Sequence, residues 1–409
     1  MTLSAPRRSA HPFLVLLSGH GGVAALTLLR NIIVARLIGV ENFGIAATFA
    51  ILVSAVEMVT TLGAQQMIVQ DADGEDVDFQ SSLHFVQLGR GIVGAAAIYA
   101  IAKPVAAFFG TPDLAWAYRT LALVPLLTGL SHLDAWRYHR NKRFGPSIWV
   151  QLGPAFLSLM LVWPLMTKFG DFRVLLVAII TQYTGMAMMS HLVAERRYLA
   201  GFCADHLRRA FRFGWPIALN GLLLLAVFHG EKLIVGHLRG SESLALLAMG
   251  FSLTLTPALI VGRSLQSYLL PQLTSVRNNP GRFHDLAASV LRFCLLAGCT
   301  LGIVLAIASP TVPWILGRDF VPLMALFPIL AALHGIRVVK SGVTVIALAH
   351  GATTNATLGN LPRVAALPVI YASLNSGGSL ETALWIATAA EGVGLVIAYA
   401  LLRRVLPAR

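Results

Sequence analysis

Basic side chains lie deep inside several long apolar stretches of the sequence, where an ionisable group is costly. Arg337 and Lys340 stand far from either end of the stretch 320–349, and Arg30 and Arg263 lie at intermediate depth in theirs. A charge at the centre of a membrane helix costs at least ~2.5–3.5 kcal/mol, so such residues normally face a bundle interior or a wet cavity. We therefore assign Arg30, Arg263, Arg337 and Lys340 as candidate substrate-binding residues of a cationic cavity.

Helical spacing supports a polar face on the stretch that carries Arg337. At 100° per residue, His334, Arg337, Ser341 and Thr344 share one side of a helix. The alternative is that these side chains only bond neighbouring helices. Four other basic residues stand about two turns or less from the end of an apolar stretch, and we expect them to snorkel to the membrane surface. They are Arg90, Arg119, Arg292 and Arg363.

Acidic residues in the apolar stretches are fewer, and they are candidates for coupling transport to an ion. They are Glu57, Glu231, Glu391 and, near the end of a stretch, Asp134. A carboxylate in a desolvated site is a natural proton carrier. Glu57 has no cation four residues away, so we assign Glu57 first and Glu231 second as coupling residues. The repeat described below aligns Arg30 with Glu231 and Asp134 with Arg337, which predicts that each of these pairs forms across the molecule.

The composition requires a membrane protein. Of 409 residues, 56% are apolar and 12% are charged, and the mean hydropathy is +0.74; soluble proteins carry about a quarter charged residues. A spanning helix needs about 20 mainly apolar residues. Twelve stretches qualify: 13–36, 43–66, 84–107, 114–134, 146–167, 172–193, 214–237, 243–270, 286–309, 320–349, 356–375 and 380–402. We expect an all-α polytopic protein.

The chain contains one large internal repeat. At an offset of 201 residues Gly39 aligns with Gly240 and Glu41 with Glu242, and further on Gly110 aligns with Gly317. A period of half the chain predicts two pseudo-symmetric six-helix bundles, and in a membrane protein duplicated halves suggest a transporter. We expect an N-terminal bundle over 1–193, a basic linker over 194–213 and a C-terminal bundle over 214–409. Each apolar run should end at a turn, the first over residues 39–42.

Basic residues also predict the orientation. With the N-terminus in the cytoplasm, sixteen Lys and Arg of the short loops fall on the cytoplasmic side and six on the other, as the positive-inside rule requires. Both termini should therefore be cytoplasmic. We therefore expect the net charge of +13 to interact with membrane lipids and not with nucleic acid. We expect no cofactor and no metal, and the acidic stretch 71–78 is expected to be a solvated loop.

The residues around the first turn resemble those of bacterial polysaccharide transporters. Ala35-Arg36-x-x-Gly39, then Phe43-Gly44 and Gly63 match the oligosaccharide-lipid (O-antigen type) flippases of the multidrug/oligosaccharidyl-lipid/polysaccharide exporter superfamily. The resemblance covers most of the chain through its two six-helix halves. In the second repeat, Gly236-His237 stand where the first has Ala35-Arg36. Because the second half departs from the motif in this way, the resemblance does not identify a coupling ion.

This resemblance implies a V-shaped central cavity that opens alternately to either side of the bacterial inner membrane. The implied cargo is an undecaprenyl-pyrophosphate-linked oligosaccharide for surface polysaccharide such as lipopolysaccharide or exopolysaccharide, with polysaccharide polymerases and glycosyltransferases as candidate partners. Related lipid flippases use arginines of the first and eighth spans, which here carries over to Arg30 and Arg263.

Two other functions remain open from the sequence. A multidrug or cation antiporter of the same superfamily would need a cavity with net acidic charge, whereas basic residues outnumber acidic ones in the apolar stretches. A membrane glycosyltransferase or polymerase would need a sizeable extracytoplasmic loop with catalytic residues. The predicted loops on that side are about a dozen residues or shorter, so we expect a transporter and not an enzyme.

Overall fold

The computed structural model describes the backbone of residues 11–405, with the side chains of 19 and 21–404, and contains helices and no strand over that range. The α-helices are α1 (His11–Thr60), α2 (Ala64–Gln70), α3 (Val77–Phe108), α4 (Ala115–Thr120), α5 (Leu123–Leu130), α6 (Asp134–Arg137), α7 (Gly145–Met160), α8 (Val162–Lys168), α9 (Arg173–Leu192), α10 (Ala204–Ser275), α11 (Pro280–Ile307), α12 (Val312–Leu316), α13 (Leu323–His350), α14 (Thr354–Asn375) and α15 (Leu380–Val405). Short 3-10 helices η1 to η5 span Ala72–Glu75, Pro112–Leu114, Tyr138–Asn141, Ser309–Thr311 and Arg318–Phe320.

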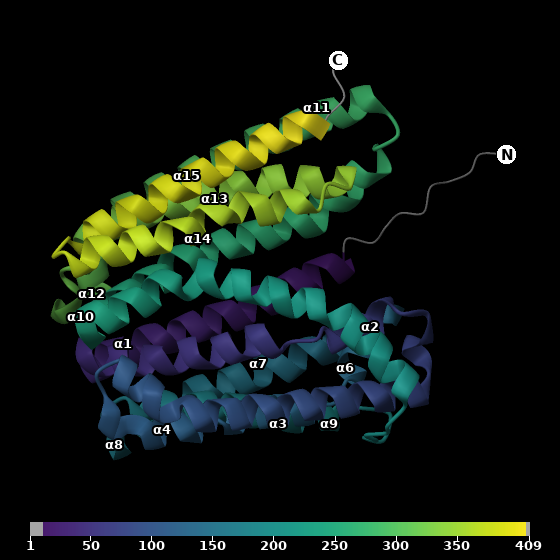
Figure 1. Ribbon diagram of the computed structural model, residues 1–409, viewed down its shortest axis with the longest axis horizontal. Coiled ribbons are helices and arrows are strands. Elements are labelled where there is room, and N and C mark those ends of the chain that lie inside the picture. Colours follow the sequence, from purple (N-terminus) through teal and green to yellow (C-terminus); the bar gives the residue numbers. More distant parts are fainter. Residues whose placement is uncertain (1–10, 406–409) are drawn as a thin grey trace.

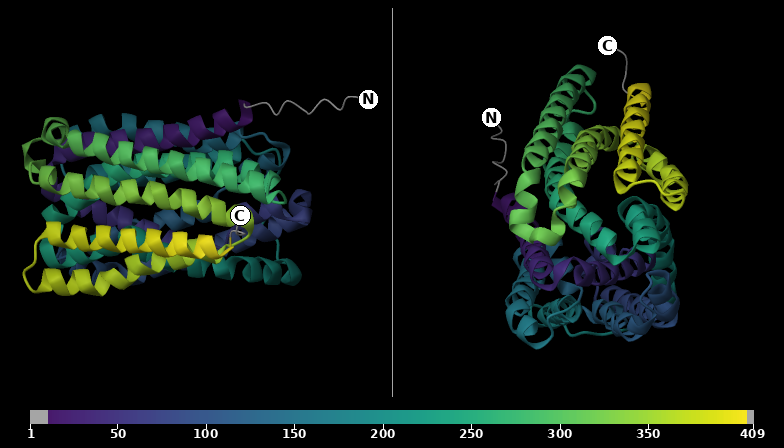
Figure 2. Two further views of the ribbon diagram at one scale, coloured as in Figure 1. Left: turned by 90° about the horizontal axis from the view of Figure 1, so that it is seen from above. Right: turned by 90° about the vertical axis from the view of Figure 1, so that its left-hand side faces the viewer.

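The helices form two bundles that repeat one plan, as the sequence predicted. Figures 1 and 2 show α1 to α9 on one side and α11 to α15 on the other, with α10 between them. The helix α1 packs closely against α10. The exact division at residues 193 and 214 stays a prediction, although α10 already begins at Ala204, inside the expected linker.

Two glycines at equivalent positions divide the longest helices. Gly39 in α1 has φ 78° and ψ 171°, and Gly240 in α10 has φ 78° and ψ −172°. This backbone region is essentially restricted to glycine. The expected four-residue turn over 39–42 is therefore wrong in extent, because only Gly39 leaves the helical conformation and the next helix begins at once. The matching dihedral angles confirm the repeat.

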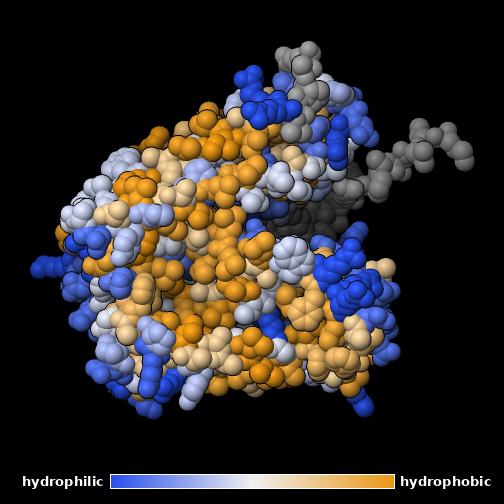
Figure 3. All heavy atoms as spheres, in the orientation of Figure 1, coloured by the Kyte–Doolittle hydropathy of each residue, from blue (hydrophilic) through white to orange (hydrophobic). Residues whose placement is uncertain are grey.

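The surface has the pattern of a membrane protein. Hydrophilic side chains gather at the two ends of the molecule and apolar ones form a broad band between them (Figure 3). Among the described residues, eight helices are long and apolar enough to cross a membrane. Two of these, α1 and α10, each hold two of the twelve expected spans, whereas α14 and the α4–α5 pair fall outside that count. The number twelve stays a prediction.

The two bundles touch at the end of the molecule where Gly39 lies, which we call the Gly39 end. Arg36 of α1 donates hydrogen bonds of 2.8 Å to the carbonyl oxygens of Trp314 and Ile315 in α12. Phe43 and Phe320 meet edge to face, with ring centroids 6.4 Å apart. These contacts join residues from opposite halves of the chain, so the bundles are closed against each other here.

At the opposite end, called the linker end, an ionic network ties the linker to the N-terminal bundle. Asp134 accepts hydrogen bonds from Arg137 (2.9 Å), Gln80 (2.7 Å) and the backbone N–H groups of Glu195 and Arg196 (both 2.9 Å). Burial would raise the pKa of the Asp134 carboxyl, but these hydrogen bonds outweigh it and lower the pKa to about 2. The expected Asp134–Arg337 pair is therefore wrong, because Asp134 is fully engaged at this end.

The acidic stretch 71–78 is solvated, with six of its eight residues exposed, and it is also held by ion pairs. Arg209, in the first turns of α10, forms ion pairs with Asp71 and Asp73. Glu75 pairs with Arg137 and Arg196 at 3.0 and 3.3 Å. The expectation of a solvated loop agrees with this exposure, and the basic linker adds contacts that the sequence did not predict.

We predict that Gly39→Ala and Gly240→Ala each lower the free energy of unfolding by about 1–3 kcal/mol, because a side chain is strained at these dihedral angles. A Cβ would meet only Asp319 at 3.5 Å in the first case and open space in the second, so the effect is one of the backbone. Unfolding in detergent measures it.

Gly89→Ala and Gly392→Ala are the matched controls, since a Cβ there also meets open space and the backbone is helical. Both should be neutral or stabilising by up to about 1 kcal/mol. Wild-type stability of the Gly39 and Gly240 variants would contradict the proposed strain.

Candidate functional site

Three of the cavities formed by the described residues contain candidate site residues. The interbundle cavity, of about 730 Å³, lies between the first half of α1 and the second half of α10 and is lined by Thr27, Asn31, Thr256 and Arg263, among others. It extends along α1 from Asn31 to Gly21, toward the linker end. A pocket within each bundle lies beside it. The bundles are thus closed at the Gly39 end and separated by a cavity toward the linker end.

The C-bundle pocket, of about 360 Å³, brings together three of the four predicted substrate-binding residues. Arg263 of α10 and Arg337 and Lys340 of α13 line it, with Ser341 and Asn360 among the polar neighbours. No acidic residue lines it within the described part of the chain. The predicted polar face of α13 is confirmed at Arg337, Ser341 and Thr344, which all face this pocket. On the same helix, His334 instead meets the Thr254 hydroxyl at 2.9 Å.

A buried ionic cluster stands behind the C-bundle pocket and holds its cations in place. Glu391 of α15 is 0% exposed and forms ion pairs with Lys340 at 2.5 Å, with Arg337 at 3.3 Å and with Arg363 of α14 at 3.7 Å. Arg363 in turn pairs with Glu231 of α10 at 2.5 Å. Three cations therefore share two carboxylates, and the cluster keeps an excess of positive charge.

Arg337 carries part of this excess positive charge and lines the pocket. One of its terminal nitrogens, Nη1, is buried and has no hydrogen-bond partner in the structure. The guanidinium also lies 5.1 Å from the centre of the Phe228 ring, which lines the same pocket. An unsatisfied buried donor costs about 1–3 kcal/mol or more when it is charged. Because Arg337 lines the C-bundle pocket, its positive charge acts on a ligand there.

Arg30, the fourth predicted substrate-binding residue, is placed elsewhere. Its side chain is buried within the N-terminal bundle and donates to Ser158 (2.9 Å) and Gln182 (2.6 Å). It does not form the expected pair with Glu231, whose carboxylate is taken by Arg363. That expectation is wrong because residues equivalent by the repeat lie in different bundles, where each finds a partner nearby.

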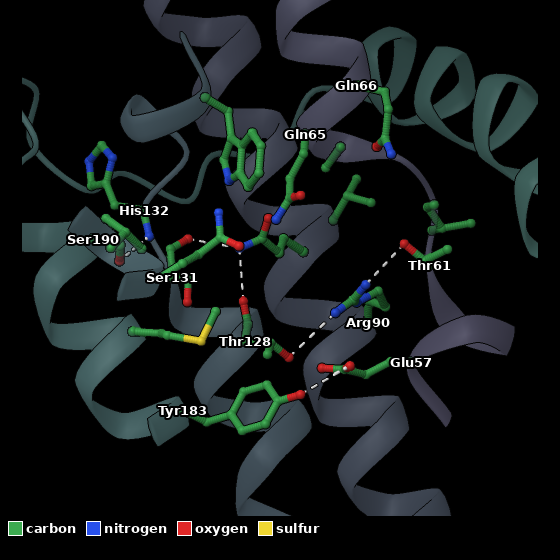
Figure 4. A pocket seen from close by; sticks show the side chains of 18 of the residues that line it. Glu57, Thr61, Gln65, Gln66, Arg90, Thr128, Ser131, His132, Tyr183 and Ser190 are labelled. Carbon is green, nitrogen blue, oxygen red and sulfur yellow. Dashed lines mark hydrogen bonds between the residues drawn. The ribbon is translucent and has the colours of Figure 1, made fainter. Parts of the chain in front are cut away.

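The N-bundle pocket, of about 390 Å³, contains Glu57, the first predicted coupling residue (Figure 4). The Tyr183 hydroxyl of α9 donates to Glu57 at 3.3 Å. Arg90 of α3 points into the same pocket and donates to Thr61 and Thr128 at 3.3 and 3.4 Å. Among the described residues that line this pocket, Glu57 is the one carboxylate and Arg90 the one guanidinium. His132 also lines it.

Two residues that were expected to snorkel are site residues instead. Arg363 is 1% exposed and is at the centre of the C-bundle cluster, and Arg90 bonds inside the N-bundle pocket. The sequence contains a signal for Arg363, since Glu391 stands in the middle of the last apolar stretch and needs a cation from another helix. Position along a helix gives depth in the membrane but not the direction in which a side chain points.

The three cavities share lining residues. Gln151 of α7 lines both the N-bundle pocket and the interbundle cavity. Arg263 lines both the interbundle cavity and the C-bundle pocket. The cavities therefore follow one another from bundle to bundle.

Several solved membrane proteins share this fold. The lipid II flippase MurJ in an inward closed conformation superposes with a TM-score of 0.75 at 15% identity, over 95% of this chain and 87% of that one. An inward-facing multidrug resistance transporter of the MATE family and MOP superfamily gives 0.71 at 11% identity, over 96% and 94%. An outward-facing one gives 0.59 at 13% identity, over 97% and 96%. At these identities the likeness shows the fold.

The chain thus has the fold of the MATE and MurJ structures. The sequence profile of the polysaccharide biosynthesis protein family matches residues 33–325, well over half of the chain. The chain belongs to that family, and the resemblance seen in the sequence is confirmed. A comparison with curated protein sequences gave no match.

We predict that Glu231→Gln lowers the free energy of unfolding by about 3–5 kcal/mol, because it removes the shorter ion pair of the buried Arg363 and leaves only the 3.7 Å contact with Glu391. Adding Arg363→Gln should recover most of the loss, as a double-mutant cycle in detergent would show. The matched double variant Glu231→Gln/Arg30→Gln should show no recovery. Recovery by Arg30→Gln and not by Arg363→Gln would contradict the pairing described above.

Proposed function

We propose that the chain is an alternating-access flippase that moves a lipid-linked, undecaprenyl-pyrophosphate-type oligosaccharide across the bacterial cytoplasmic membrane for surface polysaccharide synthesis. The observation that carries this proposal is the C-bundle pocket, where Arg263, Arg337 and Lys340 meet without a lining carboxylate. A pocket of this charge selects an anion. Membership of the polysaccharide biosynthesis protein family supports a glycan-bearing one.

A pyrophosphate suits this set of residues. Guanidinium groups bind phosphate oxygens through paired, charge-assisted hydrogen bonds, and an ammonium group adds a point charge. Glu391 holds Arg337 and Lys340 from behind, so both cations are fixed in place before the ligand arrives. A preorganised site loses less entropy on binding. Arg30 is not part of this site and we propose a structural role for it.

The competing functions are less well supported. A multidrug or cation antiporter would bind positive charge, which the C-bundle pocket would repel. The fold is that of transporters, and the proposal is therefore that the chain is not an enzyme. A glycosyltransferase or polymerase would need a sizeable extracytoplasmic loop with catalytic residues, which the sequence does not predict.

The conformation supports a site open to the cytoplasm. The contacts at the Gly39 end and the cavity toward the linker end are consistent with an inward-open state if the linker end is cytoplasmic, as the basic loops predict. Inward closed and inward-facing structures give TM-scores of 0.75 and 0.71 and an outward-facing one gives 0.59, which agrees with an inward-facing conformation. We propose an inner-membrane location with both termini in the cytoplasm.

Coupling to an ion is assigned to Glu57 in this proposal. Glu231 is committed to the ion pair with Arg363, whereas Glu57 accepts one long hydrogen bond from Tyr183 and lines an open pocket. Transport requires a group whose interactions differ between the two states. A carboxylate that gains and loses a proton as its pocket opens and closes would meet that requirement.

We predict that Arg263→Ala and Arg337→Ala abolish export of lipid-linked glycan while the protein stays in the membrane at normal levels. Losing a hydrogen bond to a charged group weakens binding by about ten- to a hundredfold. Lysine at either position should rescue partly, because it cannot bind pyrophosphate in a bidentate way. Arg292→Ala, in α11 and outside the pocket, is the matched control. Normal export by both alanine variants would show that these arginines are structural.

We predict that Glu57→Gln impairs proton-driven transport in reconstituted vesicles while substrate still binds. Glutamine keeps a hydrogen-bond acceptor but cannot take up and release a proton. Transport against an imposed pH gradient measures this. The control is Glu41→Gln, an exposed carboxylate at the Gly39 end. Undiminished gradient-driven transport by Glu57→Gln would remove Glu57 from the mechanism.

A further inference from the structure

We propose that the N-bundle pocket binds an uncharged sugar residue of the substrate, while the pyrophosphate lies in the C-bundle pocket. This inference rests on the proposed function, because it assigns a second part of the same molecule. It gives the two bundles different tasks, one recognising the glycan and the other its anionic link to the lipid.

The N-bundle pocket differs from the C-bundle pocket in charge. One carboxylate, Glu57, and one guanidinium, Arg90, line it, so its formal charge is near zero with His132 neutral. The C-bundle pocket has three cations and, among the described residues, no lining carboxylate. A pyrophosphate would therefore favour the C-bundle pocket, and an uncharged group has no such preference. The N-bundle pocket is suited to the uncharged part of a long substrate.

The polar groups of the N-bundle pocket match a ligand rich in hydroxyl groups. Its lining includes four side-chain amides, from Gln65, Gln66, Gln87 and Gln151. An amide offers two donors and an acceptor, and a sugar hydroxyl is likewise both donor and acceptor. Trp136 adds an aromatic wall to the pocket. Small-molecule sites commonly combine a few such polar groups with aromatic side chains in clefts of about 300–1,000 Å³.

Among these polar groups Glu57 and Arg90 are only loosely bound, whereas Gln87 donates to the carbonyl oxygens of Thr128 and Ser131 at 2.9 and 2.7 Å. The hydrogen bonds of Glu57 to Tyr183 and of Arg90 to Thr61 and Thr128 measure 3.3–3.4 Å, longer than the usual 2.7–3.2 Å. Gln65 and Gln66 of α2 are exposed and line the pocket. Ligand hydroxyls could therefore replace or add to these bonds at little cost.

A proton site alone does not account for this pocket. Carrying a proton needs one carboxylate with restricted access to water, whereas this cavity has a volume of about 390 Å³ and a lining of amides and hydroxyls. Glu57 can do both, since it can accept a bond from a sugar hydroxyl and also carry a proton. Binding of the glycan would then influence the protonation of Glu57, which links the cargo to the coupling step.

The succession of cavities allows one substrate to occupy both pockets. Gln151 connects the N-bundle pocket to the interbundle cavity, and Arg263 connects that cavity to the C-bundle pocket. Between them the interbundle cavity presents uncharged polar side chains such as Thr27, Asn31 and Thr256. An oligosaccharide could extend through it from the pyrophosphate to the N-bundle pocket.

The test separates the two parts of the substrate. The purified full-length chain in lipid nanodiscs is titrated with two probes: farnesyl diphosphate, which has the pyrophosphate but no sugar, and the phosphate-free glycan released by mild acid from the lipid-linked oligosaccharide of the native host. The variant is Gln65→Ala/Gln66→Ala, and Gln70→Ala on the same helix α2 but outside the pocket is its matched control.

The double variant should bind the glycan at least about tenfold more weakly, as loss of two hydrogen bonds implies, and bind farnesyl diphosphate like the wild type. Gln70→Ala should change neither affinity, and Arg337→Ala should weaken farnesyl diphosphate alone. Equal glycan affinity of the double variant and the wild type, or no glycan binding by the wild type at millimolar concentration, would overturn the sugar pocket. Failure of farnesyl diphosphate to bind would instead overturn the proposed pyrophosphate site and leave the glycan result standing.

Discussion

Charge buried in an apolar bundle is the constraint on which the rest of this structure depends. Each ionised side chain within the membrane must find a partner or face water, because its desolvation is too costly otherwise. In the C-terminal bundle this places Glu231, Glu391 and Arg363 at the centre, where four helices supply one connected ionic cluster. Arg337 and Lys340, which share Glu391 within this cluster, also line the pocket. The stability of the bundle and the affinity of the pocket therefore come from the same set of charges.

The two halves share one backbone plan because of the repeat, and they differ in function because their interior side chains have diverged. Gly39 and Gly240 adopt the same unusual dihedral angles, so both halves turn back through the membrane in the same way. Their interiors differ, however: the N-terminal bundle pairs Arg30 with neutral groups and keeps a pocket of balanced charge, whereas the C-terminal bundle concentrates positive charge. An asymmetric substrate with an anionic end and a neutral end fits such a molecule.

Apolar stretches and break residues predicted the helices and the repeat well, because a membrane helix must satisfy its own backbone and its length is set by the bilayer. Depth within a stretch also predicted that Arg337 and Lys340 face a cavity. It failed for Arg363 and Arg30, since the side of a helix that meets a partner depends on packing between helices. Residues equivalent by sequence repeat are not neighbours in space, which is why the expected pair of Arg30 with Glu231 is absent.

The central claim is that this chain moves a lipid-linked oligosaccharide between leaflets, and sidedness in proteoliposomes tests it most directly. The lipid-linked oligosaccharide of the native host is incorporated into vesicles with the purified protein, and a membrane-impermeant glycan oxidant added outside reports which leaflet holds the sugar. Our account predicts that nearly all of the glycan becomes oxidisable with the protein present, and only the outer-leaflet fraction without it. Equal oxidation in vesicles with and without the protein would contradict the account.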